Sequence, residues 1–371
     1  MDERTRIALL ITELRPAGAE RVVYDLATGL DRDRFDVRVC SLTSRDDDDG
    51  AIARDLEAAG IPVFPARMRS KLDVLGARRL ARGVAEFRPH ILHAHLFHAN
   101  LAARLLGRRV GAERVVSTIH IVERRPLRLR RILERLGARR DDVTVCVSEA
   151  VARHARDDLG VANPRVVYNG IDVDRFLGLP AKESARRALG LPTDGPLIGC
   201  VGRLSHQKGV DVLLRAFATM SADSSVVVAG EGEEESVLRA LARDLGVAER
   251  VHFVGFQDDV RGVLAAIDAF CMPSRWEGFG LALVEALAAG VPVVATGVDS
   301  IPEVMGDAGV RVPPDDVAAL ASALDEVLRE PRANDPLCDR GRAQAARFGL
   351  DSMVAAYDAL YSEIWPASSS R

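Results

Sequence analysis

Residues 273–296 read PSRWEGFGLALVEALAAGVPVVAT, and this stretch decides the fold class of the chain. A short apolar run ends at Met272, a glycine-rich loop follows, a helical pattern begins near Leu281, and a second apolar run begins at Val291. Strand, loop, helix and strand in this order form the unit from which parallel sheets with crossover helices are built. The stretch therefore predicts an α/β domain with a functional loop at the carboxyl end of a strand.

The same alternation runs through the rest of the chain and restarts once, near the middle. A length of 371 residues fits two domains, each with its own core. Proline and glycine gather between Asp174 and Asp194, so we place the first domain at residues 1–175 and the second at residues 180–349. The predicted strands are Ile7–Thr12, Val37–Ser41, Ile61–Phe64, Ile91–His95, Val115–Ile119, Val143–Val147, Val166–Tyr168, Leu197–Val201, Ser225–Ala229, Val251–Val254, Ala269–Met272, Val291–Ala295 and Val310–Val312.

The composition is that of an ordinary globular protein, with 48% hydrophobic and 28% charged residues. A formal net charge of −4 gives no basic field, so no nucleic-acid partner is expected. The five cysteines are odd in number and widely spaced, which predicts neither disulfides nor a zinc site and favours a reducing cytoplasm. The apolar run Ile7–Ile11 is too short for a signal peptide, and no run approaches the ~18 apolar residues of a membrane span.

Two acidic residues flank the helix start in the opening stretch. Glu277 lies in the loop and Glu285 lies about one turn into the helix. The helix N-terminus, and the close backbone approach that Gly278 and Gly280 allow, suit a bound anion. The pattern predicts a diphosphate site in which the two carboxylates bind two different polyol units of one ligand. In the alternative interpretation, Glu285 only complements the helix dipole and Glu277 only faces solvent.

A second stretch, GCVGRLSHQKGVDVLLRAF over Gly199–Phe217, also runs from a strand through a short loop into a helix. Arg203 and Lys208 flank that loop, and Lys208 is one of only three lysines in the chain. Two cations at the carboxyl end of a strand, beside a helix start, predict a site for a phosphate-bearing ligand. The alternative is a pair of surface cations without a ligand.

These motifs resemble those of the retaining glycosyltransferases of family 4. The matched pieces are G-R-L-x-x-x-K-G at Gly202–Gly209, the E-x7-E pair with its internal G-F-G, and Asn169–Asp172 ahead of the expected domain boundary. The resemblance covers essentially the whole chain. It implies the GT-B architecture of two doubly wound Rossmann-like domains with an interdomain cleft. The first domain would bind the acceptor and the second the nucleotide-sugar donor, and a final helix over residues 350–366 would pack back onto the first.

The resemblance also implies a role for each matched residue of the second domain. Arg203 and Lys208 would hold the donor diphosphate, Glu277 would hydrogen-bond to hydroxyls of the sugar, and Glu285 would bind those of the ribose. The remaining donor contacts are implied at Gly202, Gly278, Phe279, Gly280 and Leu281.

In the first domain the match is less complete. Residues 15–20 read RPAGAE and resemble the family's Gly-Gly-Ala-Glu turn, which faces donor phosphate and acceptor. Ala17 stands in place of the first glycine, so close backbone approach is expected only at Gly18. His120 follows a strand and matches a Thr-x-His position whose histidine contacts the transferred sugar; a buried structural histidine is the alternative.

The implied activity is transfer of a sugar from a nucleotide diphosphate sugar to an acceptor in polysaccharide or glycoconjugate biosynthesis. UDP-glucose and UDP-N-acetylglucosamine are the first donor candidates, and the acceptor would be a glycan, a lipid-linked sugar or a small molecule. The cations and the helix N-terminus would stabilise the departing diphosphate, so no metal or other cofactor is expected. His93, His95 and His98 cluster near a strand end without a fourth ligand and predict no zinc site.

Three other classes remain open. A GT-B-type sugar-nucleotide epimerase or hydrolase would share the fold and the diphosphate site. A nicotinamide dehydrogenase fits less well, because Gly230-Glu231-Gly232 lacks the third glycine of the dinucleotide fingerprint and is followed by more acids. A two-lobed sugar-binding protein would need no phosphate-binding cations and should be exported.

A basic helix is predicted within Glu123–Arg140, where ERRPLRLRRILERLGARR carries eight arginines against two acids. Four apolar residues between Arg124 and Arg140 have the spacing of an amphipathic helix. They are Leu129, Ile132, Leu133 and Leu136. In one interpretation the apolar stripe faces the core and the arginines are solvated. In the other the helix docks on an anionic membrane, and the protein is cytoplasmic and peripheral at the inner face of that membrane.

Overall fold

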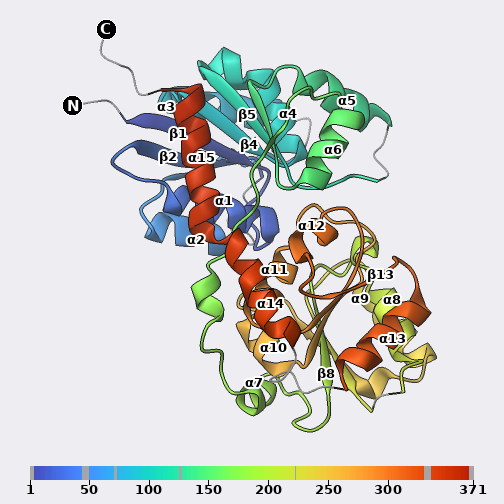
Figure 1. Cartoon of the computed structure of the whole chain (residues 1–371). Coiled ribbons are helices and arrows are strands. Elements are labelled where there is room, and N and C mark those ends of the chain that lie inside the picture. The colour runs from blue at the N-terminus through green and yellow to red at the C-terminus, as the bar shows by residue number, and fades with distance from the viewer. Residues whose placement is uncertain are drawn as a thin grey trace. The chain divides into compact units, whose positions relative to one another are not determined.

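The computed structural model describes residues 4–43, 50–70, 73–124, 128–221, 223–329 and 336–366. Contacts between residues divide the chain into unit 1, Met1–Gly170 with Leu350–Arg371, and unit 2, Ile171–Gly349. The boundary between the units lies at Gly170–Ile171, a few residues before the predicted boundary at residues 175–180. Ile171 already belongs to unit 2, where it bridges to Gly349 and donates its N–H to the carbonyl of Phe348. Figure 1 follows the chain from blue to red.

Within the described residues, unit 1 is built on a parallel sheet of seven strands in the order β3-β2-β1-β4-β5-β6-β7. Its order reverses between β1 and β4, and the carboxyl ends of the strands at such a switch point open a crevice. The strands are β1 (Thr5–Ile11), β2 (Phe35–Ser41), β3 (Val63–Pro65), β4 (Ile91–His95), β5 (Arg114–Ile119), β6 (Val143–Cys146) and β7 (Arg165–Val166).

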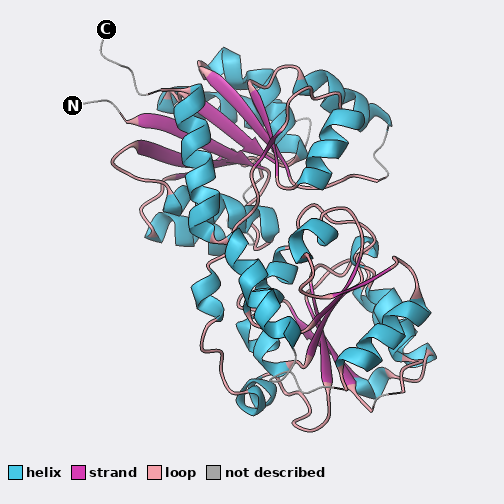
Figure 2. Ribbon diagram, viewed as in Figure 1, coloured by secondary structure: helices cyan, strands magenta, loops and turns pink. Residues whose placement is uncertain are grey.

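Helices cover both faces of the sheet of unit 1 (Figure 2). They are α1 (Gly18–Gly29), α2 (Gly50–Ala58), α3 (Val74–Phe87), α4 (Phe97–Leu106), α5 (Arg128–Ala138), α6 (Glu149–Asp157) and α15 (Leu350–Ile364), with the short 3₁₀ helix η1 (Gly107–Val110). Helix α15 buries the predicted face of Met353, Tyr357, Leu360 and Tyr361. It lies so close to α1 that a Cβ atom at Gly29 would stand 2.7 Å from Cγ2 of Val354.

Unit 2 repeats this plan with a parallel sheet that, in its described part, has six strands in the order β10-β9-β8-β11-β12-β13. The switch point lies between β8 and β11. The strands are β8 (Leu197–Val201), β9 (Ser225–Ala229), β10 (Val251–Gly255), β11 (Ala269–Met272), β12 (Val293–Thr296) and β13 (Val310–Val312). The helices are α7 (Lys182–Ala188), α8 (Val210–Phe217), α9 (Glu235–Asp244), α10 (Arg261–Ala266), α11 (Leu281–Ala288), α12 (Ile301–Met305), α13 (Val317–Val327) and α14 (Pro336–Ala345), with 3₁₀ turns η2 (Val173–Phe176), η3 (His206–Lys208), η4 (Ala248–Arg250) and η6 (Ala346–Phe348).

Each unit has an apolar core between its sheet and its helices. All thirteen predicted strands are present among the described residues, and five have the predicted bounds. No end of these strands lies more than two residues from its predicted position, and β12 begins two residues later than predicted. The N–H of Val291 donates to the carbonyl of Ala286 at the end of α11, and Pro292 has no N–H, so strand pairing starts only at Val293.

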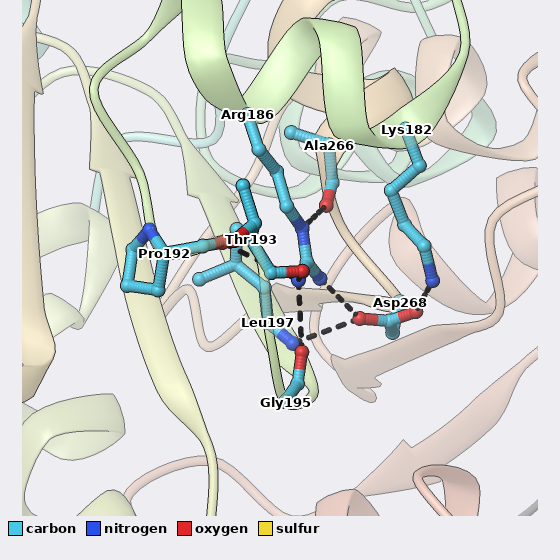
Figure 3. Close-up of polar contacts among 8 residues, drawn as sticks. All are labelled: Lys182, Arg186, Pro192, Thr193, Gly195, Leu197, Ala266 and Asp268. Atoms are coloured by element: carbon cyan, nitrogen blue, oxygen red, sulfur yellow. Dashed lines mark hydrogen bonds and ion pairs between the residues drawn. The ribbon is translucent and has the colours of Figure 1, made fainter.

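The segment read from sequence as a linker contains a buried anchor (Figure 3). Arg186 of α7 is 1% exposed and donates to the carbonyls of Ala266 (2.8 Å) and Gly195 (2.9 Å). Its Nη2 atom lies 2.7 Å from Oδ2 of Asp268, and that carboxylate also accepts the Leu197 N–H. The anchor ties α7 to the amino ends of β8 and β11, at the opposite edge of the sheet from the predicted site.

Candidate active site

The two sequence stretches singled out above lie on neighbouring strands and meet at the switch point of unit 2. The hydrogen bonds that join the loop after β8 to the loop after β11 include one from Arg275 N to the Gln207 carbonyl (2.8 Å) and one from Gln207 Nε2 to the Trp276 carbonyl (3.0 Å). A Cβ atom at Gly209 would lie 2.1 Å from the carbonyl oxygen of Pro273. Glycine is therefore required at this position for the loops to meet.

Lys208 and Glu277 form an ion pair where these loops meet. Nζ of Lys208 lies 2.5 Å from Oε1 of Glu277, and Ser274 donates its hydroxyl to the same oxygen at 2.8 Å. Glu277 is buried, at 4% exposure, and Lys208 is partly buried. The prediction placed each residue in a ligand site but did not pair them. An ion pair at this end of the sheet offers a cation to a phosphate and an acceptor to a hydroxyl group.

A third segment, which the sequence reading did not assign to the site, holds the β11–α11 loop in place. After β12, Thr296 donates its hydroxyl to the Ser274 carbonyl (2.5 Å), and Ser300 donates to that of Phe279 (3.2 Å). The carboxylate of Asp299 accepts the N–H of Glu277 at 3.0 Å. Asp299 has a φ of +42°, a left-handed conformation uncommon for a residue with a side chain. No periodicity or motif signals this bracing role.

Helix α11 starts at Leu281, as predicted, after Gly280 at a φ of +91°. No side chain caps this end by a hydrogen bond in the described structure, so the first amides of the helix have no side-chain acceptor there. Gly278 and Phe279 of the loop are buried, and Glu285 lies one turn into the helix, partly exposed. A helix N-terminus of this kind is suited to a bound anion, and anion binding here stays a prediction.

Arg203 does not join Lys208 in this structure. Its side chain is 74% exposed and its Nε atom lies 3.4 Å from Glu233, while Gly202 before it has a φ of +154°. Within the described residues, no three His, Cys, Asp or Glu side chains form a group suited to a metal. Both phosphate-binding by Arg203 and independence from metal therefore stay predictions.

In unit 1, Gly18 is the first residue of α1 and is exposed, after Ala17 in an extended conformation. His120 follows β5 with part of its surface accessible, yet burial lowers its pKa to about 4, so its ring is neutral at neutral pH. His95 at the end of β4 lies beside it, with Nδ1 3.0 Å from Nε2 of His120. The Thr-x-His position therefore holds a neutral imidazole with a buried histidine partner.

Helix α5 corrects one interpretation of the basic segment. Leu129, Ile132 and Leu136 are 67%, 53% and 55% exposed, so the reading of a core-facing stripe is wrong for these residues. The inward face is narrow instead: Gly137 is buried, and a Cβ there would lie 3.0 Å from Cδ of Arg104. Arg125, Pro126 and Leu127 lie outside the described residues.

A buried ion pair lies beside Gly137 of α5. Arg104 of α4 donates to both oxygens of Asp141, a pair whose side chains are 3% and 1% exposed. Gly137 packs against this pair, whereas Leu129, Ile132 and Leu136 are exposed. No described helix has both the length and the apolar character needed to cross a bilayer.

Comparison with known proteins agrees with this geometry. Residues 16–175 match the family model described as Glycosyltransferase Family 4, and residues 181–346 match the one described as Glycosyl transferases group 1. The chain is 32% identical over 239 residues to the lipopolysaccharide core biosynthesis mannosyltransferase LpsB of Rhizobium meliloti, an alignment that covers 61% of this chain and 67% of LpsB.

A second relative aligns over more of the chain. It is the GDP-mannose-dependent alpha-(1-6)-phosphatidylinositol monomannoside mannosyltransferase of Mycolicibacterium smegmatis, 34% identical over 282 residues, which cover 69% of this chain and 72% of the relative. Among solved structures, HepE of Anabaena in complex with UDP and glucose superposes with a TM-score of 0.86 at 22% identity, over 97% of this chain and 100% of HepE. The chain therefore belongs to glycosyltransferase family 4, and it has the GT-B fold of two Rossmann-like domains.

Proposed function

We propose that this glycosyltransferase moves a hexosyl group from a nucleotide diphosphate sugar to an acceptor hydroxyl, with retention of configuration and without a metal ion. The observation that carries the proposal is the Lys208–Glu277 ion pair at the switch point of unit 2, beside the open N-terminus of α11. One member of the pair offers positive charge to a diphosphate, and the other offers an acceptor to sugar hydroxyls.

Charge stabilisation is the main catalytic contribution in this proposal. As the bond between the anomeric carbon and the diphosphate oxygen breaks, negative charge develops on the leaving group. Lys208, Arg203 and the amides of Gly278–Leu281 would meet that charge in a fixed arrangement, and Glu285 would hold the ribose. In unit 1, His120 would bind the transferred sugar and Gly18 would contact the donor phosphate.

Glu277 is poorly suited to act as a covalent nucleophile. Its Oε1 atom is already engaged by Lys208 and Ser274, and its backbone N–H is tied to Asp299. We therefore assign it to holding hydroxyls. The acceptor oxygen would attack the face that the diphosphate leaves, forming the new bond to the anomeric carbon while the acceptor's proton passes to the departing phosphate oxygen.

The donor is proposed to be UDP-glucose or UDP-N-acetylglucosamine, and HepE, which shares the fold, has been solved with UDP and glucose. GDP-mannose is the competing donor, because one relative is named as GDP-mannose-dependent and LpsB is named as a mannosyltransferase. A thermal-shift panel of UDP, GDP and their sugars, run with and without EDTA, separates these donors because a ligand of the native state raises Tm. A ligand that raises the Tm equally with and without EDTA supports the proposal. A rise in Tm that requires a divalent metal contradicts it.

Two alternatives make different predictions in the same assay. An epimerase or hydrolase would consume the donor without any acceptor, whereas a transferase turns over only when acceptor is present. For a sugar-binding protein, free sugar alone would raise the Tm, and the diphosphate would make no difference to it. The anomeric configuration of the product, read by NMR coupling constants, then tests retention.

The acceptor is proposed to be a glycan or lipid-linked sugar at an anionic membrane surface. Helix α5 presents exposed Leu129, Ile132 and Leu136 next to exposed arginines, a combination that binds anionic lipid through apolar burial and charge together. The exposed arginines of this helix and its C-terminal flank are Arg128, Arg131, Arg135, Arg139 and Arg140.

A further inference from the structure

Three histidine rings lie in contact at the carboxyl ends of β4 and β5 in unit 1. His93 and His95 belong to β4 and are fully buried, and His120 follows β5. The ring centroids of His93 and His95 are 4.2 Å apart, and those of His95 and His120 are 5.3 Å apart. The described contacts of these rings determine which ring nitrogen of His120 carries its proton.

His93 is fully occupied by two hydroxyl groups. Its Nδ1 atom lies 2.6 Å from the hydroxyl of Tyr361 on α15, and its Nε2 atom lies 2.6 Å from Oγ1 of Thr118 on β5. Both nitrogens are therefore engaged by groups other than His95, whose ring lies tilted by 39° against that of His93. Through Tyr361, the C-terminal helix fixes the position of this ring.

His95 makes one hydrogen bond, between its Nδ1 and Nε2 of His120 at 3.0 Å. Its own Nε2 is buried and has no hydrogen-bond partner among the described residues. Burial holds the pKa of His95 well below its usual range and lowers those of His93 and His120 to about 3 and about 4. All three rings are thus neutral at neutral pH, and each carries a single N–H.

Two proton arrangements satisfy the His95–His120 bond, and they differ at His95 Nε2. If His120 donates, the proton of His95 must sit on Nε2, as a buried N–H without an acceptor. If His95 donates from Nδ1, its Nε2 is only a bare lone pair. Buried N–H groups without a partner are the rarer case, and each unmade bond of this kind is unfavourable. The second arrangement is therefore favoured.

We propose that His95 is a positioning residue that holds His120 in its Nδ1–H tautomer. His120 then presents a hydrogen-bond donor, and not a lone pair, to a ligand at the carboxyl end of β5. That ligand would be an oxygen acceptor, a hydroxyl or phosphate oxygen of the sugar donor. The identity of the ligand rests on the proposed function, whereas the tautomer does not, because it is fixed in the protein without ligand.

The tautomer can be measured directly on the full-length protein without substrate. Long-range ¹H–¹⁵N correlation spectra distinguish protonated from bare imidazole nitrogens, and the chain has only eight histidines to assign. We expect His120 to be protonated on Nδ1 in the wild type and to populate both tautomers in His95→Phe. Protonation of His120 on Nε2 in the wild type would overturn the proposal, and so would a His95→Phe spectrum in which His120 is unchanged.

Two further substitutions of the buried His95 separate positioning from packing. His95→Asn places an amide N–H at the same number of bonds from Cβ as Nδ1, whereas His95→Gln places it at the distance of Nε2. We expect the Asn variant to keep the His120 tautomer and to retain kcat within about three-fold, and the Gln variant to lose about ten-fold. The matched control is His98→Ala, which alters a neighbouring histidine of α4 and should leave the His120 tautomer unchanged.

The two kinds of readout fail independently. If the spectra show the Nδ1–H tautomer and its dependence on His95, but the Asn and Gln variants turn over the donor equally, the positioning stands and the proposed contact of His120 with the sugar is wrong. If His95→Gln loses activity while the His120 tautomer is the same in wild type, Asn and Gln proteins, the positioning role is wrong.

Discussion

Nζ of Lys208 lies 2.5 Å from Oε1 of Glu277, joining two loops whose residues are 69 positions apart in the chain. Because the carboxylate is buried and the ammonium is largely covered, neither charge is fully solvated. Removing one member leaves the other in a poorly solvated position, which is unfavourable unless a ligand replaces the lost charge. The pair is thus poised to exchange one of its partners for a bound phosphate or hydroxyl.

Replacing Lys208 by alanine should lower kcat by about 10²-fold, because the charge that meets the departing diphosphate is lost. The measurement is steady-state turnover of the donor identified in the thermal-shift panel. Lys182→Ala is the matched control, since this lysine pairs with Asp268 in the anchor network away from the crevice. Turnover of Lys208→Ala within a few-fold of the control would remove Lys208 from the mechanism.

Gly209→Ala should destabilise unit 2 by about 3 kcal/mol, because the new Cβ would meet the Pro273 carbonyl at 2.1 Å and the φ of +65° disfavours a side chain. Two glycines of the same unit separate these causes. Gly246 has a φ of +71° and Gly262 has an ordinary φ, and a Cβ at either meets nothing within 4 Å.

Urea denaturation of the three alanine variants is the measurement. Gly246→Ala should lose only about 1 kcal/mol, from backbone conformation alone. Gly262→Ala, within helix α10, should be unchanged or more stable by up to about 1 kcal/mol. If Gly209→Ala matched Gly246→Ala, the close approach of the two loops would not be a constraint on this position.

Arg186→Ala should destabilise the protein by about 2–4 kcal/mol, because the buried carbonyls of Ala266 and Gly195 lose their donor and Asp268 loses one of its two cationic partners. Arg187→Ala is the control, since the neighbouring arginine has a side chain that is 66% exposed and a weak pair with Glu183. Thermal unfolding followed by circular dichroism compares the two, and equal Tm values would contradict an anchoring role for Arg186.

The sequence predicted most of the fold but less of the site, and particular residues show why. Leu197–Val201 and Ala269–Met272 are buried apolar runs between clear helical patterns, so local periodicity set their bounds. Glu277, Lys208 and the start of α11 follow from motif spacing. The Lys208–Glu277 pairing does not, because it depends on which strands are neighbours in the sheet.

Other features were invisible for a different reason. Asp299 and Ser300 brace the loop through single hydrogen bonds that leave no periodic signal. In α5 the spacing predicts an apolar stripe, but Leu129, Ile132 and Leu136 of that stripe are exposed. Hydrophobic periodicity identifies a face without telling whether that face meets a core or a partner.

The buried histidines predict a specific loss of stability in acid. Burial lowers the folded-state pKa of His93 to about 3, against 6.5 for the ordinary group. Between about pH 6 and pH 4 the unfolded chain therefore binds a proton that the native protein does not, so stability is full above pH 6.5 and falls as the pH is lowered. One proton corresponds to about 1.4 kcal/mol per pH unit.

Urea unfolding of wild type and His93→Gln between about pH 6 and pH 4.5 isolates this contribution, because the other titrating groups are common to both proteins. The slope of the free energy of unfolding against pH should be shallower in His93→Gln by about 1.4 kcal/mol per pH unit. Equal slopes would show that His93 is protonated in the folded protein.

The outward face of α5 gives a prediction for membrane binding in which charge and apolar contact are separable. Replacing Leu129, Ile132 and Leu136 together by serine should weaken co-sedimentation with phosphatidylglycerol vesicles by at least about ten-fold, because three exposed side chains lose their burial in lipid. The Tm should stay unchanged, since these side chains contribute little to the core.

Val237→Ser on α9, at 64% exposure, is the control for loss of an exposed apolar residue elsewhere. Added salt should weaken the wild type and the triple variant alike, because the arginines remain. If the wild-type protein does not sediment with these vesicles at low salt, α5 is a solvated helix. The proposal of an acceptor at an anionic membrane surface is then wrong.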